Sequence, residues 1–213
     1  MFDNSVNVLL PESGPGFVTS NRGNDEFQWG QQTTIDAALR TANAWDVLHP
    51  NHAFSIGQIS KKGGGHFPPH HSHKHGLDID VRPLRKDGKN LPVDMSESQY
   101  DRALTTELID LWWTNAPVQL VYFNDQTVIN AGLSIHCAGH NDHFHVRVRV
   151  KDGQIRIHDR GSDVAEVQTI LGIGVDGKFG PQTLLAVEAF QSTHGLISDG
   201  IVGKDTWAAL RAI

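Results

Sequence analysis

The sequence has little cysteine, no long apolar run and no excess of basic residues, and each of these absences excludes a class of protein. Cys137 is the one cysteine among 213 residues, which excludes an internal disulfide framework and a thiolate zinc cluster. No run approaches the ~18 apolar residues of a membrane-spanning helix. The formal net charge is −6, so the composition does not favour nucleic acid as a partner. We expect a protein that neither binds nucleic acid nor inserts into a membrane; its oligomeric state stays open, with a monomer favoured.

The first residues also lack the features of a secretory signal. Asp3 is acidic, the first basic residue is Arg22, and the one apolar run there is 8–10. A signal peptide needs a basic start followed by a longer apolar stretch. The expectation is therefore synthesis in the cytoplasm without a signal peptide. Action outside the cytoplasm would then require release or injection by another component.

Histidine is abundant and clustered. Of 13 histidines, five lie between 66 and 75 and four between 136 and 145. Such tracts can bind metals adventitiously at a surface. However, Asp78 and Asp80 fall on one face of a predicted strand over 76–82, because strand side chains alternate. His143 and His145 fall on one face of a second predicted strand over 143–150. This shared register favours a specific metal site over a surface tract.

If these two strands are neighbours in one sheet, His73, Asp80 and His145 can converge. Two histidines and one carboxylate with an open fourth position suit catalytic zinc. The alternative is the iron triad of metal-dependent oxygenases, which has the same residue types. That triad usually places its first histidine and its carboxylate almost adjacent, whereas six residues separate His73 from Asp80. The spacing therefore favours zinc.

The remaining periodicity predicts an α+β domain, in which an antiparallel sheet carries the zinc site and helices flank it. Helices are expected over 34–48, capped by Thr34, and over 96–115, where Ser96 and Gln99 suggest a capping box. Further strands are expected over 53–60 and 118–123.

The end of the chain contains a repeat. The pattern D-G-x-x-G-x-x-T occurs at 176–183 and again at 199–206, offset by 23 residues. Each D-G pair predicts a turn immediately before a helix. Together with an earlier helix that Asp163 and Glu166 could cap, the repeat predicts a small domain of three helices. We therefore expect two domains, 1–154 and 155–213.

Residues 72–80, which read S-H-K-H-G-L-D-I-D, resemble the S-H-x-x-G-L-D-x-D motif of penicillin-insensitive murein endopeptidases. These peptidases belong to a wider group with the lysostaphin-type peptidases, the D-Ala-D-Ala peptidases and the hedgehog N-domain. The resemblance spans roughly residues 8–150. It implies that the zinc ligands are His73, Asp80 and His145, that His143 is a catalytic histidine, and that His70 and His140 are further active-site histidines. The segment 158–213 resembles a small peptidoglycan-binding domain.

The identity of the general base stays open between two neighbouring residues. His143 lies on the same strand face as His145, next to where a metal-bound water would be. Related phage peptidases and D-Ala-D-Ala dipeptidases place an acidic base three residues before their last zinc histidine, which is the position of Asp142. In a regular strand Asp142 points to the opposite face, and only a bend at the start of the strand would bring it in.

The resemblance implies zinc-dependent hydrolysis of the D-alanyl–meso-diaminopimelyl cross-link of bacterial peptidoglycan, with peptidoglycan as the partner of both domains. A lytic enzyme such as a phage endolysin would fit this activity, and so would an injected antibacterial effector. The alternative of another class is a non-catalytic, zinc-stabilised peptidoglycan-binding protein.

Overall fold

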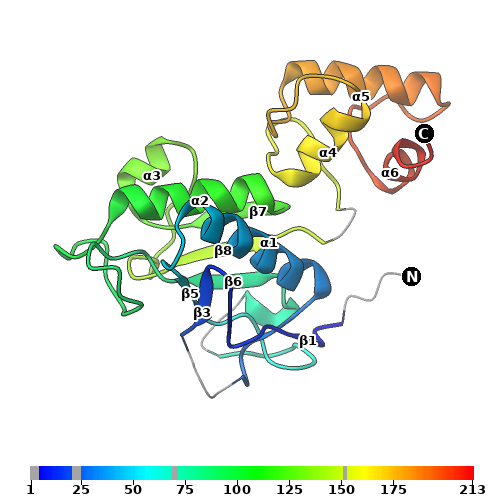
Figure 1. The fold of residues 1–213 in the computed structure, drawn as a ribbon. Coiled ribbons are helices and arrows are strands. Elements are labelled where there is room, and N and C mark those ends of the chain that lie inside the picture. Colours follow the sequence, from blue (N-terminus) through cyan, green and yellow to red (C-terminus); the bar gives the residue numbers. More distant parts are fainter. Residues whose placement is uncertain (1–4, 21–24, 69–71, 151–152) are drawn as a thin grey trace.

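A computed structural model describes residues 5–20, 25–68, 72–150 and 153–213 of the chain. Figure 1 shows a mixed sheet with helices over it, followed by a separate group of helices at the end of the chain. In the first group the strands are β1 (Val8–Leu9), β2 (Ser13–Gly14), β3 (Phe17–Thr19), β4 (Trp29–Gly30), β5 (Phe54–Ile56), β6 (Asp78–Val81), β7 (Val118–Tyr122) and β8 (Phe144–Val148). The helices are α1 (Gln32–Leu48), the 3₁₀ helix η1 (His73–His75), α2 (Arg102–Asn115), α3 (Gln126–Asn130), α4 (Ser162–Ile170), α5 (Pro181–Thr193) and α6 (Lys204–Leu210).

The main sheet has six strands in the order β2-β3-β5-β6-β8-β7. All neighbouring strands are antiparallel except β3 and β5, which are parallel. This arrangement confirms the α+β prediction. The two strands that carry the histidine and aspartate pattern, β6 and β8, are direct neighbours, with Asp80 opposite His145. A short second sheet pairs β1 with β4.

One face of the sheet is apolar and the other is polar, because side chains alternate along β6 and β8. The apolar side chains of β6 and β8 are fully buried: Ile79, Val81, Phe144, Val146 and Val148. They share one hydrophobic cluster with the apolar stripes of α1 and α2, which lie side by side over this face in Figure 1. The helices therefore cover the apolar face, and the opposite face is left for the polar side chains of the same strands.

The start of α1 differs slightly from its prediction. The helix begins at Gln32, so that Thr34 lies inside its first turn instead of capping it. The Thr34 hydroxyl is buried and donates a hydrogen bond to the Gly76 carbonyl, 2.7 Å away. Thr34 therefore ties α1 to the end of η1, which carries the predicted ligand His73.

The prediction for the second helix was wrong at its start. The helix α2 begins at Arg102, not near Ser96, and Asp101 caps it by accepting a hydrogen bond from the Leu104 amide. Ser96 instead donates from both its amide and its hydroxyl to Asp94 Oδ1. A nearby aspartate therefore competes successfully for Ser96 and forms a turn in place of a helix cap.

The last helices form their own core. Ile155, Val164, Val167, Phe179, Val187, Phe190, Val202, Trp207 and Leu210 make up a second hydrophobic cluster. The sequence repeat extends to a repeated hydrogen-bond network, which centres on a buried glutamine. Gln168 Nε2 donates to Asp176 and Thr183, and Gln191 Nε2 donates to Asp199 and Thr206. The two networks are offset by the same 23 residues as the motif.

Gln191→Ala should destabilise this helical domain by about 2–4 kcal/mol, because it leaves several buried polar groups without their hydrogen bonds. Gln191 is only 1% exposed, and its Oε1 also accepts from the Gly200 amide. The exposed Gln182 on α5 is the matched control, and Gln182→Ala should change stability by no more than about 0.5 kcal/mol. Denaturant unfolding, followed by tryptophan fluorescence to which Trp207 contributes as one of five tryptophans, measures both variants. Equal stability of the two variants would contradict the role of the repeated network.

A buried arginine connects the sheet to the segment that leads into the end helices. Arg149, directly after β8, donates to the Val118 carbonyl and forms ion pairs with Asp159 and Asp163. Next to it, the Arg160 guanidinium lies over the Trp113 ring. These contacts dock the end helices against the edge of the sheet. Within the described ranges, none of the helices has both the length and the apolar character needed to cross a membrane.

Candidate active site

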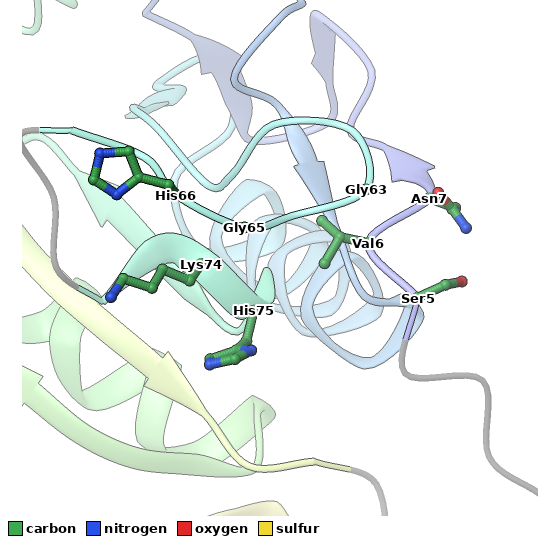
Figure 2. Close-up of a pocket in the computed structure, with 8 residues that line it drawn as sticks. All are labelled: Ser5, Val6, Asn7, Gly63, Gly65, His66, Lys74 and His75. Atoms are coloured by element: carbon green, nitrogen blue, oxygen red, sulfur yellow. The ribbon is translucent and has the colours of Figure 1, made fainter.

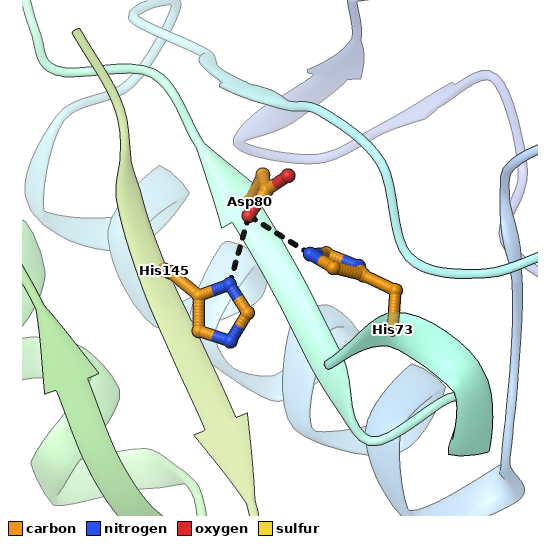
Figure 3. Close-up of side chains that lie close together, drawn as sticks. All are labelled: His73, Asp80 and His145. Atoms are coloured by element: carbon orange, nitrogen blue, oxygen red, sulfur yellow. Dashed lines mark hydrogen bonds and ion pairs between the residues drawn. The ribbon is translucent and has the colours of Figure 1, made fainter. Parts of the chain in front are cut away.

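Three side chains from three separate elements converge on the polar face of the sheet. His73 comes from η1, Asp80 from β6 and His145 from β8, as Figure 3 shows. One nitrogen or oxygen atom from each lies within 4.8 Å of the others, and all three residues are buried. His73 Nε2 is 3.3 Å and His145 Nδ1 is 3.0 Å from the same atom, Asp80 Oδ1. The structure therefore brings together the three residues predicted as ligands.

The backbone fixes the orientation of His73. Its ring Nδ1 is 2.6 Å from the Ile59 carbonyl, to which it donates, so that Nε2 faces Asp80. The 3₁₀ helix ends at Gly76, which has a φ of +61°. A Cβ at this position would lie 2.7 Å from the Val6 side chain, so the turn requires glycine for both backbone conformation and space.

His145 is oriented in the same way by a carboxylate. Its Nε2 lies 2.9 Å from Asp78 Oδ1, and its Nδ1 faces Asp80. Asp78 is the next metal-side residue along β6 and is 1% exposed. Histidines that bind metals almost always donate their second ring N–H to a carbonyl or a carboxylate. Both His73 and His145 have such a partner, so the donor set fits a metal ion.

The electrostatics of the site favour a positive charge between the two carboxylates. Burial alone would lower the pKa of His145, but hydrogen bonds and charges from Asp78 and Asp80 outweigh it and raise the pKa to about 9. Burial raises the pKa of Asp80, but hydrogen bonds and charges from His145 and His73 hold it well below its usual range. The anionic carboxylates are therefore strongly stabilised, and a bound cation would take over from the proton on His145.

Two of the other predicted residues lie beside this cluster. His143 Nε2 is 3.9 Å from Asp80 Oδ1, and its Nδ1 is 2.8 Å from Asp142 Oδ1. The chain bends at 141–142, and β8 begins only at Phe144. This bend turns the Asp142 carboxylate toward the His143 ring. Asp142 thus contacts the imidazole that the sequence analysis treated as its competitor.

His140 completes a row of imidazoles. Its ring centroid is 4.7 Å from that of His143 and 5.7 Å from that of His145. Its Nδ1 lies 3.1 Å from the Ala138 carbonyl, so Nδ1 carries the hydrogen and neutral His140 has a lone pair on Nε2. Burial and then the nearby His143 lower the pKa of His140, which favours this neutral form. His70, the other predicted histidine, lies outside the described residues.

Two further residues, Tyr122 and Asn124, lie near the cluster, and neither was among the predicted site residues. Tyr122 is opposite His145 in the β7–β8 register, and its ring centroid lies 5.7 Å from His145 and 5.3 Å from His140. The position of Tyr122 follows from β7 being the neighbour of β8, which the local sequence does not indicate. Asn124 anchors the loop before His140, because its Oδ1 accepts from the Cys137 amide and its Nδ2 donates to Asn141. Nothing in the local sequence indicated this role.

A cavity of about 540 Å³ lies beside η1, between the N-terminal segment and a glycine-rich loop. Figure 2 shows its lining residues, which are Ser5, Val6, Asn7, Gly63, Gly65, His66, Lys74 and His75. His66 and His75 therefore belong to the wall of this cavity. It contains none of the three converging side chains.

Two models of known protein families match the chain. The family model of penicillin-insensitive murein endopeptidases matches residues 5–126, which include His73 and Asp80. A model of a peptidoglycan binding domain matches residues 149–210. The first match covers more than half of the chain. The chain belongs to the penicillin-insensitive murein endopeptidase family.

Individual relatives match only short stretches. One is the N-acetylmuramoyl-L-alanine amidase CwlL of Bacillus licheniformis, 52% identical over 40 residues, which are 19% of this chain and 11% of the amidase. Another is the zinc D-Ala-D-Ala carboxypeptidase of Streptomyces albus G, 51% identical over 35 residues, which are 16% of this chain and 14% of that enzyme. The crystal structure of the Burkholderia AP3 phage endolysin is 44% identical over 28% of this chain and 25% of its own, with a TM-score of 0.27. The chain thus spans only a small part of each.

Proposed function

We propose that this protein hydrolyses peptide cross-links of bacterial peptidoglycan with a zinc ion held by His73, Asp80 and His145. The supporting observation is the donor set itself. Three donor atoms lie within 4.8 Å of one another, and the Ile59 carbonyl and Asp78 orient the two imidazoles from behind. Two histidines and one carboxylate leave a further position open, which is typical of catalytic zinc. Membership of the endopeptidase family supports the same reaction.

We also propose a division of work between two domains, 1–154 and 155–213. The first would carry the reaction, and the second would bind the wall. The two separate hydrophobic clusters and the two family matches support this division. Because both domains would meet the same polymer, binding by the second raises the effective concentration of substrate at the first.

When bound, zinc would supply polarisation of the scissile carbonyl and a lowered pKa of the attacking water. The protein would supply the proton transfer. His143 accepts the proton of the water at Nε2, the nitrogen that faces the Asp80 side of the site. Asp142 holds Nδ1–H and stabilises the imidazolium that results. His143 then delivers the proton to the leaving amine.

We propose that His140 acts as a hydrogen-bond acceptor, although an active-site histidine could also act as a donor to the oxyanion. With Nδ1–H given to a backbone carbonyl, the neutral ring presents an acceptor at Nε2. His140 would therefore accept a hydrogen bond from the substrate or from the attacking water. A donor role would require the doubly protonated ring, which the lowered pKa disfavours.

The proposed bond is the D-alanyl–meso-diaminopimelyl cross-link, and the proposed setting is lysis of the cell wall, as by a phage endolysin or an injected effector. Dye release from labelled peptidoglycan tests the reaction. We expect release by the zinc-loaded protein, loss of release with a chelator, and recovery when zinc is added back. Sacculi that bind the protein without release of dye would show a non-catalytic wall-binding protein. Iron in place of zinc in the purified protein would support the oxygenase alternative.

Asp78→Asn should weaken zinc binding by roughly 10- to 100-fold, the range found when the hydrogen-bond partner of a metal-ligating histidine is removed. The carboxylate of Asp78 accepts the Nε2–H of His145, and an amide would bind it less strongly and without charge. Competition with a chromophoric chelator measures the change. Asp110→Asn, on the exposed side of α2, is the control and should leave the affinity unchanged. Equal affinities of the two variants would contradict the role of Asp78.

A further inference from the structure

Arg147 is the next residue of the metal-side face along β8 after His145. It lies about 6.7 Å further along the strand and pairs across the sheet with Asp78. A single carboxylate oxygen, Asp78 Oδ1, accepts from Arg147 Nε at 2.7 Å and from His145 Nε2 at 2.9 Å. The guanidinium is therefore held at a fixed place beside the metal centre by the same atom that orients a predicted ligand.

Only one edge of the guanidinium takes part in this contact. Within the described ranges, the side-chain hydrogen bonding of Arg147 consists of the Nε bond to Asp78. The side chain is 30% exposed, whereas that of Asp78 is 2% exposed. The Nη1 and Nη2 groups, with four N–H donors between them, therefore remain available to a ligand on the metal side of the sheet.

The charges of the centre leave a surplus at Arg147. Asp78 and Asp80 contribute two negative charges, and a divalent zinc ion would balance them. The positive charge of Arg147 is then the net charge of the group formed by Asp78, Asp80, zinc and Arg147. A fixed cation with a free pair of donors is the arrangement that binds a carboxylate in two parallel hydrogen bonds.

We propose that Arg147 binds a carboxylate of the substrate on the leaving-amine side of the scissile bond. This inference rests on the proposed function. In a D-alanyl–meso-diaminopimelyl cross-link, the carbon that bears the amide nitrogen also bears a free carboxylate. The Arg147 guanidinium belongs to a residue about 6.7 Å along the strand from His145. At this separation it can bind that carboxylate while the amide is at the metal. Arg147 is thus a specificity residue that selects carboxylated over amidated diaminopimelate.

The test compares two cross-linked muropeptides that differ only in this carboxylate, which is free in one and amidated in the other. For the zinc-loaded wild-type protein we expect kcat/KM to be on the order of 10- to 100-fold higher on the free acid, the worth of a charged hydrogen bond. Arg147→Gln should bring the ratio close to one while cleavage of the amidated substrate remains. Arg147→Lys keeps the positive charge but lacks the planar pair of N–H donors, and it should give an intermediate ratio.

Arg40→Gln is the matched control. Arg40 is an exposed arginine on α1, over the opposite face of the sheet, where it donates to the Asn115 carbonyl. This variant should keep the wild-type ratio. Zinc content, measured for every variant, separates a change in specificity from damage to the metal centre through Asp78.

Calorimetry with the product peptides gives a second readout, which does not depend on turnover or on any variant. The wild-type protein should bind the free-acid product more tightly than its amide. Cleavage of both substrates at equal rates, or an unchanged ratio in zinc-loaded Arg147→Gln, would overturn the inference and leave the proposed function intact. Cleavage of neither substrate would refute the proposed function, and equal binding of the two products would then overturn the inference as well.

Discussion

His145→Ala should remove zinc from the purified protein and lower turnover on cross-linked muropeptides by roughly 10³- to 10⁵-fold. His145 supplies one of the three donors, and it lies fully buried between Asp78 and Asp80. Its loss leaves two carboxylates facing each other without the imidazole that separates them. A metal at a peptidase centre lowers the activation barrier by several kcal/mol, and each 1.36 kcal/mol changes the rate tenfold.

Metal analysis and turnover on a defined muropeptide dimer measure the two effects in the same preparation. His136→Ala is the matched control, because His136 is an exposed histidine in the same cluster of the sequence. It should keep about one zinc per chain and wild-type turnover. A His145→Ala protein with full zinc content and activity would refute the assignment of the centre.

The second large effect is expected for His143→Ala, which should keep zinc but lose on the order of 10²- to 10⁴-fold in turnover. His143 Nε2 is 3.9 Å from Asp80 Oδ1, which is beyond hydrogen-bond distance. Its removal therefore leaves the donor set intact. It takes away the imidazole that would move the proton between water and leaving amine.

Asp142→Asn should cost much less, no more than roughly tenfold. The Asp142 side chain is 66% exposed, so water screens its charge, and an asparagine oxygen can still accept Nδ1–H from His143. Turnover and zinc content, measured for both variants on one substrate, compare the two residues. A greater loss in zinc-loaded Asp142→Asn than in zinc-loaded His143→Ala would transfer the role of base to Asp142.

The arrangement of the metal-side face followed from local pattern, because strand alternation is a strictly local property. Asp78 and Asp80 alternate with apolar residues along β6, as do His145 and Arg147 along β8. The same alternation explains the buried apolar face under α1 and α2. The pattern also indicated two histidines and a carboxylate as the donors, and their role as ligands stays a prediction.

The start of α2 and the bend at Asp142 could not be obtained in this way. Ser96 occurs in a pattern typical of a helix cap, but in the structure its hydroxyl donates to Asp94 within a turn. Asp142 lies in the wrong phase for a regular strand, but β8 begins two residues later. In both cases a local hydrogen bond, between Ser96 and Asp94 and between His143 and Asp142, lies outside the periodic pattern on which the prediction depended.

The sequence by itself determined the two domains' residue patterns, the polar and apolar faces of β6 and β8, and the residues eligible to bind a metal, since all of these depend on neighbours within one element. Only the tertiary structure decided which ring nitrogen of each histidine faces Asp80. That choice depends on the Ile59 carbonyl and on Asp78, which hold the opposite ring nitrogens of His73 and His145. It also decided that Arg147 shares an oxygen with His145, because a contact across two strands exists only once their register is set.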